Sequence, residues 1–313
     1  MKKTLLYLTT AIFLLASCKK STKTGGDIPP GKTYNVNFTA NLDKSLTATN
    51  QNKLKVNAVS NLTAAVASKF WYIVYDSNGN FVDQVVQTPA VSNFGSVGSN
   101  LKAGTYTIIM AAGASKLKFV SDGGNPLIYT LNGTYITYDD FTAGSHSFIH
   151  WGDTFYKKFS VTVTDANINQ NVSLERIVGQ LQIKITDTIP TSAKTIKCTL
   201  SDNDLMQNAA TLVTYRHRTI DSYTITLPDS VKGKTGQIVF NQIVSNVSRP
   251  FSVKFYFADA NGFSIARQVT VNNVTCQKNT RTILSGQLFT VNSGFQISLN
   301  ATWDPVPFTT VNF

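Results

Sequence analysis

The sequence predicts an all-β protein made of two β-sandwich domains in tandem. Apolar and polar residues alternate over short runs, and Gly, Asn, Asp and Pro interrupt these runs. Apolar residues with helical spacing are scarce. The two halves of the chain carry similar signals, and each half, at about 140 residues, is long enough to build a core of its own. We therefore expect one sandwich over residues 34–170 and a second over residues 171–313.

The first 33 residues do not have the pattern of a domain. Two lysines precede a short apolar run, which Leu15-Ala16-Ser17-Cys18 closes with small residues. This is typical of a secretory signal peptide over residues 1–17, and its end resembles the bacterial lipobox. The resemblance implies cleavage between Ser17 and Cys18 and acylation of Cys18, so that outer-membrane lipid anchors the chain. Residues 18–33 form the expected flexible tether. The alternative is an ordinary signal peptide followed by an incidental cysteine.

The strands expected in the first half are short and separated by turn residues. Clean alternation or a strongly apolar run predicts strands over 34–40, 70–75, 81–86, 101–113 and 159–164. Helical spacing is confined to two short segments, residues 64–68 and 203–209.

A strand, an Asp-x-Asn-Gly turn and a second strand occur in both halves. The turns are Asp76 to Gly79 and Asp259 to Gly262. Asn-Gly tolerates the positive φ of a tight hairpin, and the Asp side chain can accept hydrogen bonds from the turn backbone. A calcium loop is the alternative for the first turn, but the later acidic residues of such a loop are missing.

The stretch from Val172 to Pro190 lies between the two halves. Apolar alternation changes parity at Gly179, which predicts a bulge, a turn or a switch of sheet. A helical stripe is an alternative for the first part of this stretch. Arg176, the first arginine of the chain, lies on the apolar parity. It is expected either to clamp the domains through its planar fork or to lie at an edge with its head in water.

Charge and cysteine content restrict the partners of the chain. The formal net charge is +11, and removing the two lysines of the signal leaves 11 − 2 = +9. No basic run exceeds two residues, so no nucleic-acid partner is expected, whereas anionic glycan or lipid headgroups would be attracted.

Once Cys18 is acylated, two cysteines remain, Cys198 and Cys276. Export permits a disulfide between them, and two buried free thiols are the alternative.

Residues that could carry catalysis are few. Glu175 is the only glutamate, and no phosphate-binding loop or nucleophile elbow occurs. His146 and His150, with Asp153 nearby, could bind zinc, but a third ligand is not evident, and polar loop residues beside a strand are the commoner explanation. We therefore expect no enzyme activity, no metal and no cofactor.

Several of these motifs together resemble a known family. Val172-Ser-Leu-Glu-Arg-Ile-Val matches the crossover of the fimbrillin-like lipoproteins of Bacteroidetes, in particular fimbrial anchor or minor subunits of the FimB/Mfa2 type. Gly179-Gln180 departs from the usual Ala-Lys of that family. Further matches are residues 70–81, 101–107 and 279–289 and the late Trp303-Asp304.

The resemblance implies two transthyretin-like Greek-key sandwiches in a surface fimbria. In polymerising members, an Arg-directed protease removes the first strand, and a donor strand from a neighbouring subunit replaces it. No arginine precedes Arg176 here. The chain is therefore expected to be an uncleaved anchor or accessory subunit in the outer membrane that binds stalk or tip subunits by β-strand addition. Whether it faces the cell surface is left open.

Two modifications and one other function are also considered. Asp187-Thr188-Ile189 and Asp229-Ser230-Val231 resemble the O-glycosylation acceptor of this phylum, which makes Thr188 and Ser230 candidate sites. The alternative function is a glycan-binding surface lipoprotein. Among Trp71, Trp151 and Trp303, Trp151 is the preferred stacking platform because it is expected in a loop.

Overall fold

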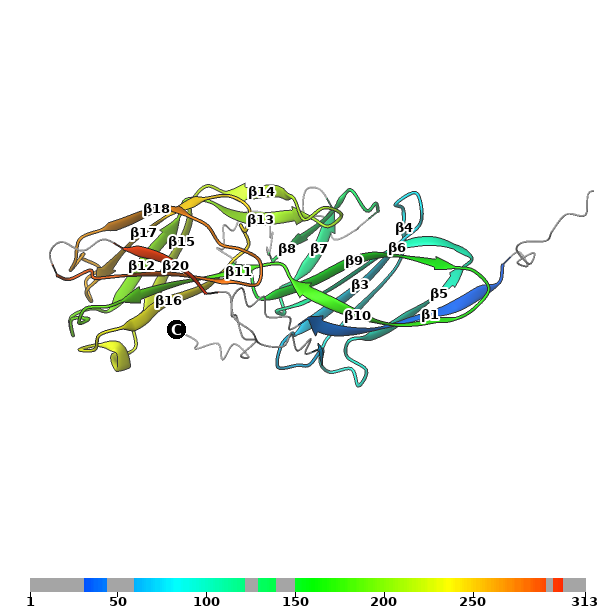
Figure 1. Ribbon diagram of the computed structural model, residues 1–313, viewed down its shortest axis with the longest axis horizontal. Helices are drawn as coiled ribbons and strands as arrows, with labels where there is room; N and C mark the ends of the chain where they lie inside the picture. Colours follow the sequence, from blue (N-terminus) through cyan, green and yellow to red (C-terminus); the bar gives the residue numbers. More distant parts are fainter. Residues whose placement is uncertain (1–30, 44–58, 122–128, 139–149, 291–294, 301–313) are drawn as a thin grey trace, which may run out of the picture.

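A computed structural model describes residues 31–43, 59–121, 129–138, 150–290 and 295–300 (Figure 1). These residues form strands and one 3-10 turn, η2 (Asp229–Val231). The predicted all-β class is confirmed. Residues 1–30, which include the expected signal peptide, Ser17, Cys18 and most of the expected tether, lie outside the described residues. Thr33, the last residue of the expected tether, already belongs to a strand, β1 (Thr33–Asp43).

An eight-stranded sheet folds over to make the first sandwich. Its order is β2-β1-β10-β9-β6-β3-β4, with β5 also paired to β1. β9 and β10 pair only at two positions, and the strands on either side of this corner pack face to face around a core that includes Phe38, Tyr72 and Met110. The strands are β1 (Thr33–Asp43), β2 (Val59–Asn61), β3 (Lys69–Tyr75), β4 (Phe81–Gln87), β5 (Ser96–Lys102), β6 (Gly104–Gly113), β9 (Thr154–Val163) and β10 (Ile168–Arg176).

β1 is an interior strand of this sheet. It pairs with β10 in parallel over seven residues and with β5 in the antiparallel sense over seven. Its alternate residues are buried, as the sequence pattern predicts: Tyr34, Val36, Phe38, Ala40 and Leu42.

Two four-stranded sheets make the second sandwich. Their orders are β16-β11-β19-β20 and β15-β12-β17-β18, and a single apolar core lies between them. The strands are β11 (Gly179–Ile185), β12 (Thr195–Leu200), β15 (Asp221–Thr226), β16 (Gln237–Val244), β17 (Phe251–Ala258), β18 (Val269–Val274), β19 (Arg281–Gly286) and β20 (Gln296–Asn300).

A fourth sheet joins the two halves, and we call it the seam sheet. Its order is β14-β13-β8-β7, so that two strands come from each half: β7 (Lys118–Ser121), β8 (Thr134–Thr137), β13 (Asn203–Asn208) and β14 (Thr214–Arg218). A third core under it contains Ile109, Phe119 and Ile136 with Ala209 and Ile243. The helix expected over residues 203–209 is wrong, because pairing with β8 and β14 holds this segment extended.

The crossover between the sandwiches is a switch of sheet, as the parity change at Gly179 predicts. β10 ends at Arg176 and β11 begins at Gly179 in another sheet. The helical alternative for the first part is wrong. The boundary between residues 170 and 171 falls inside β10 and needs correction, because β10 pairs with strands of the first sandwich as far as Arg176.

Both Asp-x-Asn-Gly turns are tight turns with an Asp cap. Asp76 accepts from the backbone N–H groups of Asn78 and Asn80 at 2.8 and 2.9 Å, and Asp259 makes the equivalent bonds in the second half. Gly79 and Gly262 have φ of +78° and +82°. These are left-handed values that favour glycine.

Candidate functional site

Arg176 lies where the chain passes from the first sandwich to the second. Its side chain is 4% exposed. Nε and Nη2 donate to the two carboxylate oxygens of Asp153 at 2.7 and 2.9 Å, and Nη1 donates to Oδ1 of Asn279 at 2.7 Å. The guanidinium also lies 4.8 Å from the centre of the Phe155 ring. Asp153 and Asn279 belong to different halves, so one planar fork contacts both.

The burial of this guanidinium decides between the two interpretations of Arg176. A solvated head at a sheet edge is excluded, because the side chain is almost fully buried and its guanidinium lies against the Phe155 ring. The contacts are those expected of an inter-domain clamp. The stability that the clamp contributes remains a prediction.

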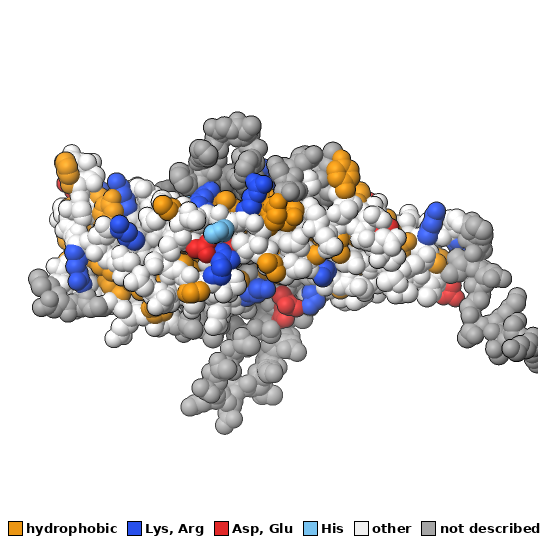
Figure 2. Space-filling model, turned by 90° about the horizontal axis from the view of Figure 1, so that it is seen from above, with side chains coloured by type: hydrophobic (Ala, Val, Ile, Leu, Met, Phe, Trp, Pro, Cys, Tyr) orange, Lys and Arg blue, Asp and Glu red, His pale blue; other side chains and the backbone are white. Residues whose placement is uncertain are grey.

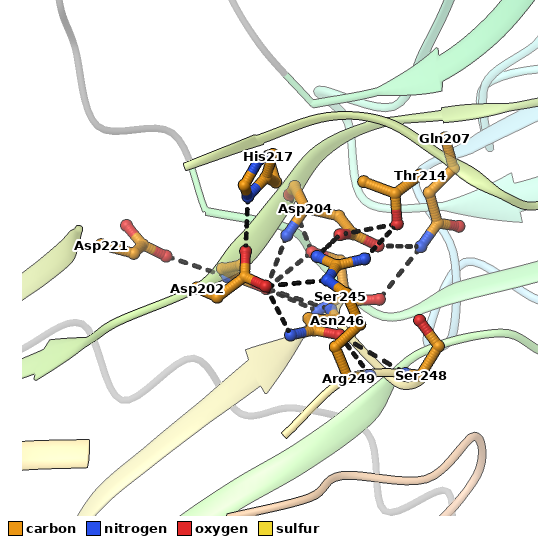
Figure 3. Close-up of polar contacts among 11 residues, drawn as sticks. Asp202, Asp204, Gln207, Thr214, His217, Asp221, Ser245, Asn246, Ser248 and Arg249 are labelled. Carbon is orange, nitrogen blue, oxygen red and sulfur yellow. Dashed lines mark hydrogen bonds and ion pairs between the residues drawn. The ribbon is translucent and has the colours of Figure 1, made fainter. Parts of the chain in front are cut away.

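A second polar network connects the seam sheet to the loop between β16 and β17 (Figure 3). Arg249 donates from Nε to Asp202 at 2.8 Å and from Nη2 to Asp204 at 2.6 Å. Thr214 on β14 contacts both Arg249 and Asp204, and His217 Nδ1 lies 2.9 Å from Asp202. Figure 2 views the side of β13 and β14, where basic, acidic and histidine side chains gather near the middle of the face.

Asn203 continues this network into the interior. Its Oδ1 accepts from the backbone N–H groups of Ser245 and Asn246, each at 3.1 Å, and its Nδ2 donates to Asp221 at 2.9 Å. Asp221 in turn accepts from the Tyr223 hydroxyl and from Arg218. The buried side chains of Asn203 and Asp221 thereby find hydrogen-bond partners, and these contacts connect elements of three sheets.

The surroundings of two acids in this network, Asp202 and Asp221, lower their pKa values. Burial raises the pKa of Asp202, but hydrogen bonds from Arg249 and His217 lower this pKa by more than burial raises it. The net shift is therefore downward. Burial likewise raises the pKa of Asp221, and hydrogen bonds from His150 and Asn203 outweigh it and bring the pKa to about 2. Bonds to Asp202 and Asp204 raise the pKa of Arg249. Each acid is held by a fixed donor, as in a structural network rather than an acid–base site.

Of the residues expected to be able to bind zinc, the two in the described part of the chain, His150 and Asp153, contact other side chains. His146 lies outside the described residues. The ring of His150 stacks on Tyr223 at 3.9 Å, and its Nδ1 lies 3.4 Å from Asp221, whereas Asp153 is occupied by Arg176. Among the described residues, no group of three His, Cys, Asp or Glu side chains is placed to hold a metal ion.

Trp151 is not a surface platform, and this expectation needs correction. Its side chain is buried in the core under the seam sheet and packs against Tyr138, with ring centres 5.4 Å apart. Trp71 is half-buried, and its Nε1 donates to the carbonyl of Leu117 at 3.1 Å. Trp303 lies outside the described residues. A loop position does not imply exposure when the loop is enclosed by two domains.

Cys198 and Cys276 are free, buried thiols, so of the two alternatives the disulfide is not formed. Both side chains belong to the core of the second sandwich. Burial raises the pKa of Cys276 to about 12 and holds the pKa of Cys198 well above its usual range, so neither is a reactive thiolate near neutral pH.

The part of the chain that the structure describes contains no apolar helix of membrane-spanning length.

The two candidate glycosylation tripeptides differ in their surroundings. Thr188 and Ser230 are both exposed. Asp187, beside Thr188, is buried, and its carboxylate accepts from the backbone N–H groups of Leu288, Phe289 and Thr290 at 2.6 to 3.1 Å. Asp187 therefore has a structural role whether or not Thr188 is modified, and modification stays a prediction.

An open groove follows strand β18, which is the last strand of its sheet. The groove has a volume of about 410 Å³, and its lining includes Arg267, Val269, Val271 and Phe295. Phe295 packs edge-on against Phe255 of the core, with ring centres 5.0 Å apart. The groove thus combines the edge of β18 with apolar side chains of that strand, Val269 and Val271, and with Phe295, which precedes β20.

The network around Arg249 is the feature that sequence reasoning missed. Its acids belong to Ser201-Asp-Asn-Asp, a segment that overlaps the start of the wrongly expected helix. The cluster of short polar residues was the available signal, but the partner of these acids, Arg249, lies 45 residues from Asp204. Only the folded chain brings them together.

Solved structures with the same fold come from Bacteroidetes, while no curated protein matches this chain. A candidate adhesin from Bacteroides ovatus aligns with a TM-score of 0.56 at 10% identity, covering 86% of this chain and 96% of that one. A candidate polysaccharide-binding protein from Bacteroides thetaiotaomicron gives 0.54 at 14% identity, with the same coverages. The fimbrial anchor protein Mfa2 from Porphyromonas gingivalis gives 0.50 at 14%, covering 86% and 98%.

These likenesses confirm, for the fold, the resemblance to fimbrillin-like proteins of the Mfa2 type. The structures are described as adhesins, fimbrial or polysaccharide-binding proteins rather than as enzymes. Residues 29–307 match the family of unknown function DUF6562. The match spans both sandwiches and the crossover, and the chain belongs to that family.

Proposed function

We propose that the protein is an accessory or anchor subunit of a surface fimbria, held to the outer membrane through acylated Cys18. The observation that carries the proposal is the pairing of β1, which has hydrogen-bonded neighbours on both sides. The first sandwich is therefore complete with its own first strand. A stalk or tip subunit would bind by adding a strand to an edge rather than by replacing β1.

The edge best suited to such a strand is β18. Within the described residues no strand pairs with the outer side of β18, and the adjoining groove would hold alternate side chains of an added strand. Val269, Val271 and Phe295 would contact the apolar side chains of the added strand.

The seam supports the same role because a fimbrial subunit transmits load between neighbours. The two sandwiches share a sheet, a core and the contacts of Arg176 and Arg249. Such an interface resists bending better than a flexible linker would.

The edge assignment can be tested by capture of a co-encoded stalk subunit or of its terminal-strand peptide. We expect residues 18–313 to capture it and Val269→Arg, which fills the groove, to reduce binding more than tenfold. Thr224→Arg on β15, the opposite edge of the same sheet, is the matched control and should bind normally. Equal binding by both variants would refute the β18 site, and absence of capture by the unmodified chain would refute the anchor role.

Membrane attachment through Cys18 requires its own test. Labelled fatty acid should be incorporated into the full-length protein in cells and lost in Cys18→Ala. Incorporation that persists in this variant would contradict the proposed lipid anchor. The stacking platform preferred for glycan binding is not available, because Trp151 is buried.

A further inference from the structure

The outer face of the sheet β15-β12-β17-β18 is dominated by hydroxyl side chains. In β12, β15 and β17, alternate residues point into the core, and the nine between them point outward. Six of these nine, which we call the hydroxyl face together with the other three, are Thr195, Thr199, Ser222, Thr224, Thr226 and Ser252. None of the nine is acidic or aliphatic, whereas exposed surfaces commonly mix charges of both signs.

Two lysines and one tyrosine complete the hydroxyl face. Lys197 on β12 lies opposite Tyr256 on β17 and Thr224 on β15, and its ammonium group is 5.9 Å from the centre of the Tyr256 ring. Lys254 lies one row along β17, opposite Thr199. Lys197 and Lys254 are therefore diagonal neighbours, whose backbones are separated by about 7–8 Å. Two cations thus stand on a flat floor of short hydroxyl side chains.

The acids nearest to this face are directed elsewhere. Asp221 begins β15, but its carboxylate is buried and accepts from internal donors. Asp259 follows β17, and its carboxylate accepts from backbone N–H groups of its own turn. Within the part of the chain that the structure describes, neither Lys197 nor Lys254 forms an ion pair with an acid. The hydroxyl face therefore carries a net positive charge.

This set of side chains restricts the kind of ligand. Hydroxyls of Thr and Ser donate and accept hydrogen bonds, which suits a ligand rich in hydroxyl groups, and lysines suit carboxylate or sulfate groups. A lipid surface would require apolar side chains that enter it, and a protein partner would require an apolar centre; none of the nine residues is aliphatic. Nucleic acid would require a denser basic cluster.

We propose that the hydroxyl face binds an acidic polysaccharide. Lys197 and Lys254 contact acidic groups that recur along the polysaccharide, and the long lysine stems allow the two ammonium groups to adjust to their spacing. The hydroxyls of the floor bond to the sugar hydroxyls between those groups. The sheet lies at the opposite end of the molecule from the start of β1, so a chain tethered before β1 can present it (Figure 1). Since the groove along β18 is not used, the proposal does not depend on the proposed fimbrial role.

Binding to immobilised chondroitin sulfate, which carries acidic groups in every disaccharide, tests the proposal with residues 18–313 carrying Cys18→Ser. We expect saturable binding that weakens with added salt, and no binding of neutral dextran. Lys197→Gln combined with Lys254→Gln should weaken binding about fivefold or more, because two exposed charge contacts are lost.

A second double variant is the matched control. Lys102→Gln combined with Lys278→Gln has the same net charge, but these exposed lysines lie on β5 and in the loop before β19. This control should bind as the unmodified chain does. The proposal would be overturned by equal loss in the two double variants, or by absence of binding to both chondroitin sulfate and polygalacturonate. Tighter binding to phosphatidylglycerol vesicles than to chondroitin sulfate would also overturn it.

Opposite charges introduced at one position test the location independently. Thr224 is exposed and lies beside Lys197 in the same row. Thr224→Arg adds a third cation and should strengthen binding, whereas Thr224→Glu pairs with Lys197 and should weaken it. The same two changes at Thr105, which is exposed on β6 of the first sandwich, should leave binding unchanged. If the changes at Thr224 act in the same direction, or no more than those at Thr105, the hydroxyl face is not the site.

Discussion

Removing the side chain of Arg176 should destabilise the whole protein, not only its crossover. In Arg176→Ala the carboxylate of Asp153, 14% exposed, loses both of its guanidinium bonds. Asn279 loses its donor, and Phe155 loses the stacked cation. A buried charge without a partner is the main penalty, and breaking a buried pair in this way costs about 3–5 kcal/mol.

This free energy converts into a measurable shift in melting temperature. At about 2.1 cal/mol/K per residue, the unfolding entropy of residues 18–313 is roughly 0.6 kcal/mol/K, so we expect the melting temperature to fall by about 5–8 °C. Arg176→Lys should recover only part of this loss, because a single ammonium cannot reproduce the planar fork that contacts Asp153 and Asn279 together.

A neighbouring ion pair provides the control. Lys157 and Glu175 also form an ion pair between β9 and β10, but their side chains are 39% and 59% exposed. Lys157→Ala should therefore cost less than about 1 kcal/mol. In a double-mutant cycle, Arg176→Met with Asp153→Ala should cost less than the sum of the two single changes. A loss below about 1 kcal/mol in Arg176→Ala, or additivity in the cycle, would refute the clamp.

Three further predictions concern other buried contacts. Asp187→Ala should cost about 2–3 kcal/mol in chemical denaturation, because backbone donors such as the N–H of Phe289 lose their acceptor, whereas Asp187→Asn should cost less; equal losses would contradict this reasoning. The folded-state pKa of Asp221, about 2, lies below its unfolded value, so its stabilisation is present above about pH 4 and should be lost between about pH 4 and pH 2; acid titration of Asp221→Asn should lack that component. Gly179→Ala should cost about 1–3 kcal/mol, because a Cβ there would lie 2.9 Å from the carbonyl oxygen of Gln277. Thermal unfolding unchanged in Gly179→Ala would show that the crossover can relax.

Local sequence was sufficient for features that short segments specify alone. The alternation in residues 34–40 predicts a strand with one buried face, and β1 has that face. Asp76 to Gly79 predicts a tight turn because Asn-Gly accepts positive φ and Asp caps the backbone. The parity change at Gly179 correctly placed the switch of sheet.

Features that depend on distant partners could not be inferred in the same way. The segment from Asn203 to Asn208 has helical spacing, yet pairing with β8 and β14 makes it a strand. Trp151 has the sequence context of a surface loop, yet the core shared by the two halves encloses it. The network around Arg249 joins residues more than 40 positions apart, and no local pattern specifies such a meeting.

The sequence by itself determined the all-β class, the turns, the interior alternation of the strands and the place where the chain changes sheet. These depend on backbone preferences and on periodicity, which operate over a few residues. The tertiary structure alone decided how the halves are joined, which side chains are buried at the seam and which strand edges remain open. Those outcomes depend on how whole sheets pack against each other, which is why Arg176 became a contact between both halves and Trp151 became core.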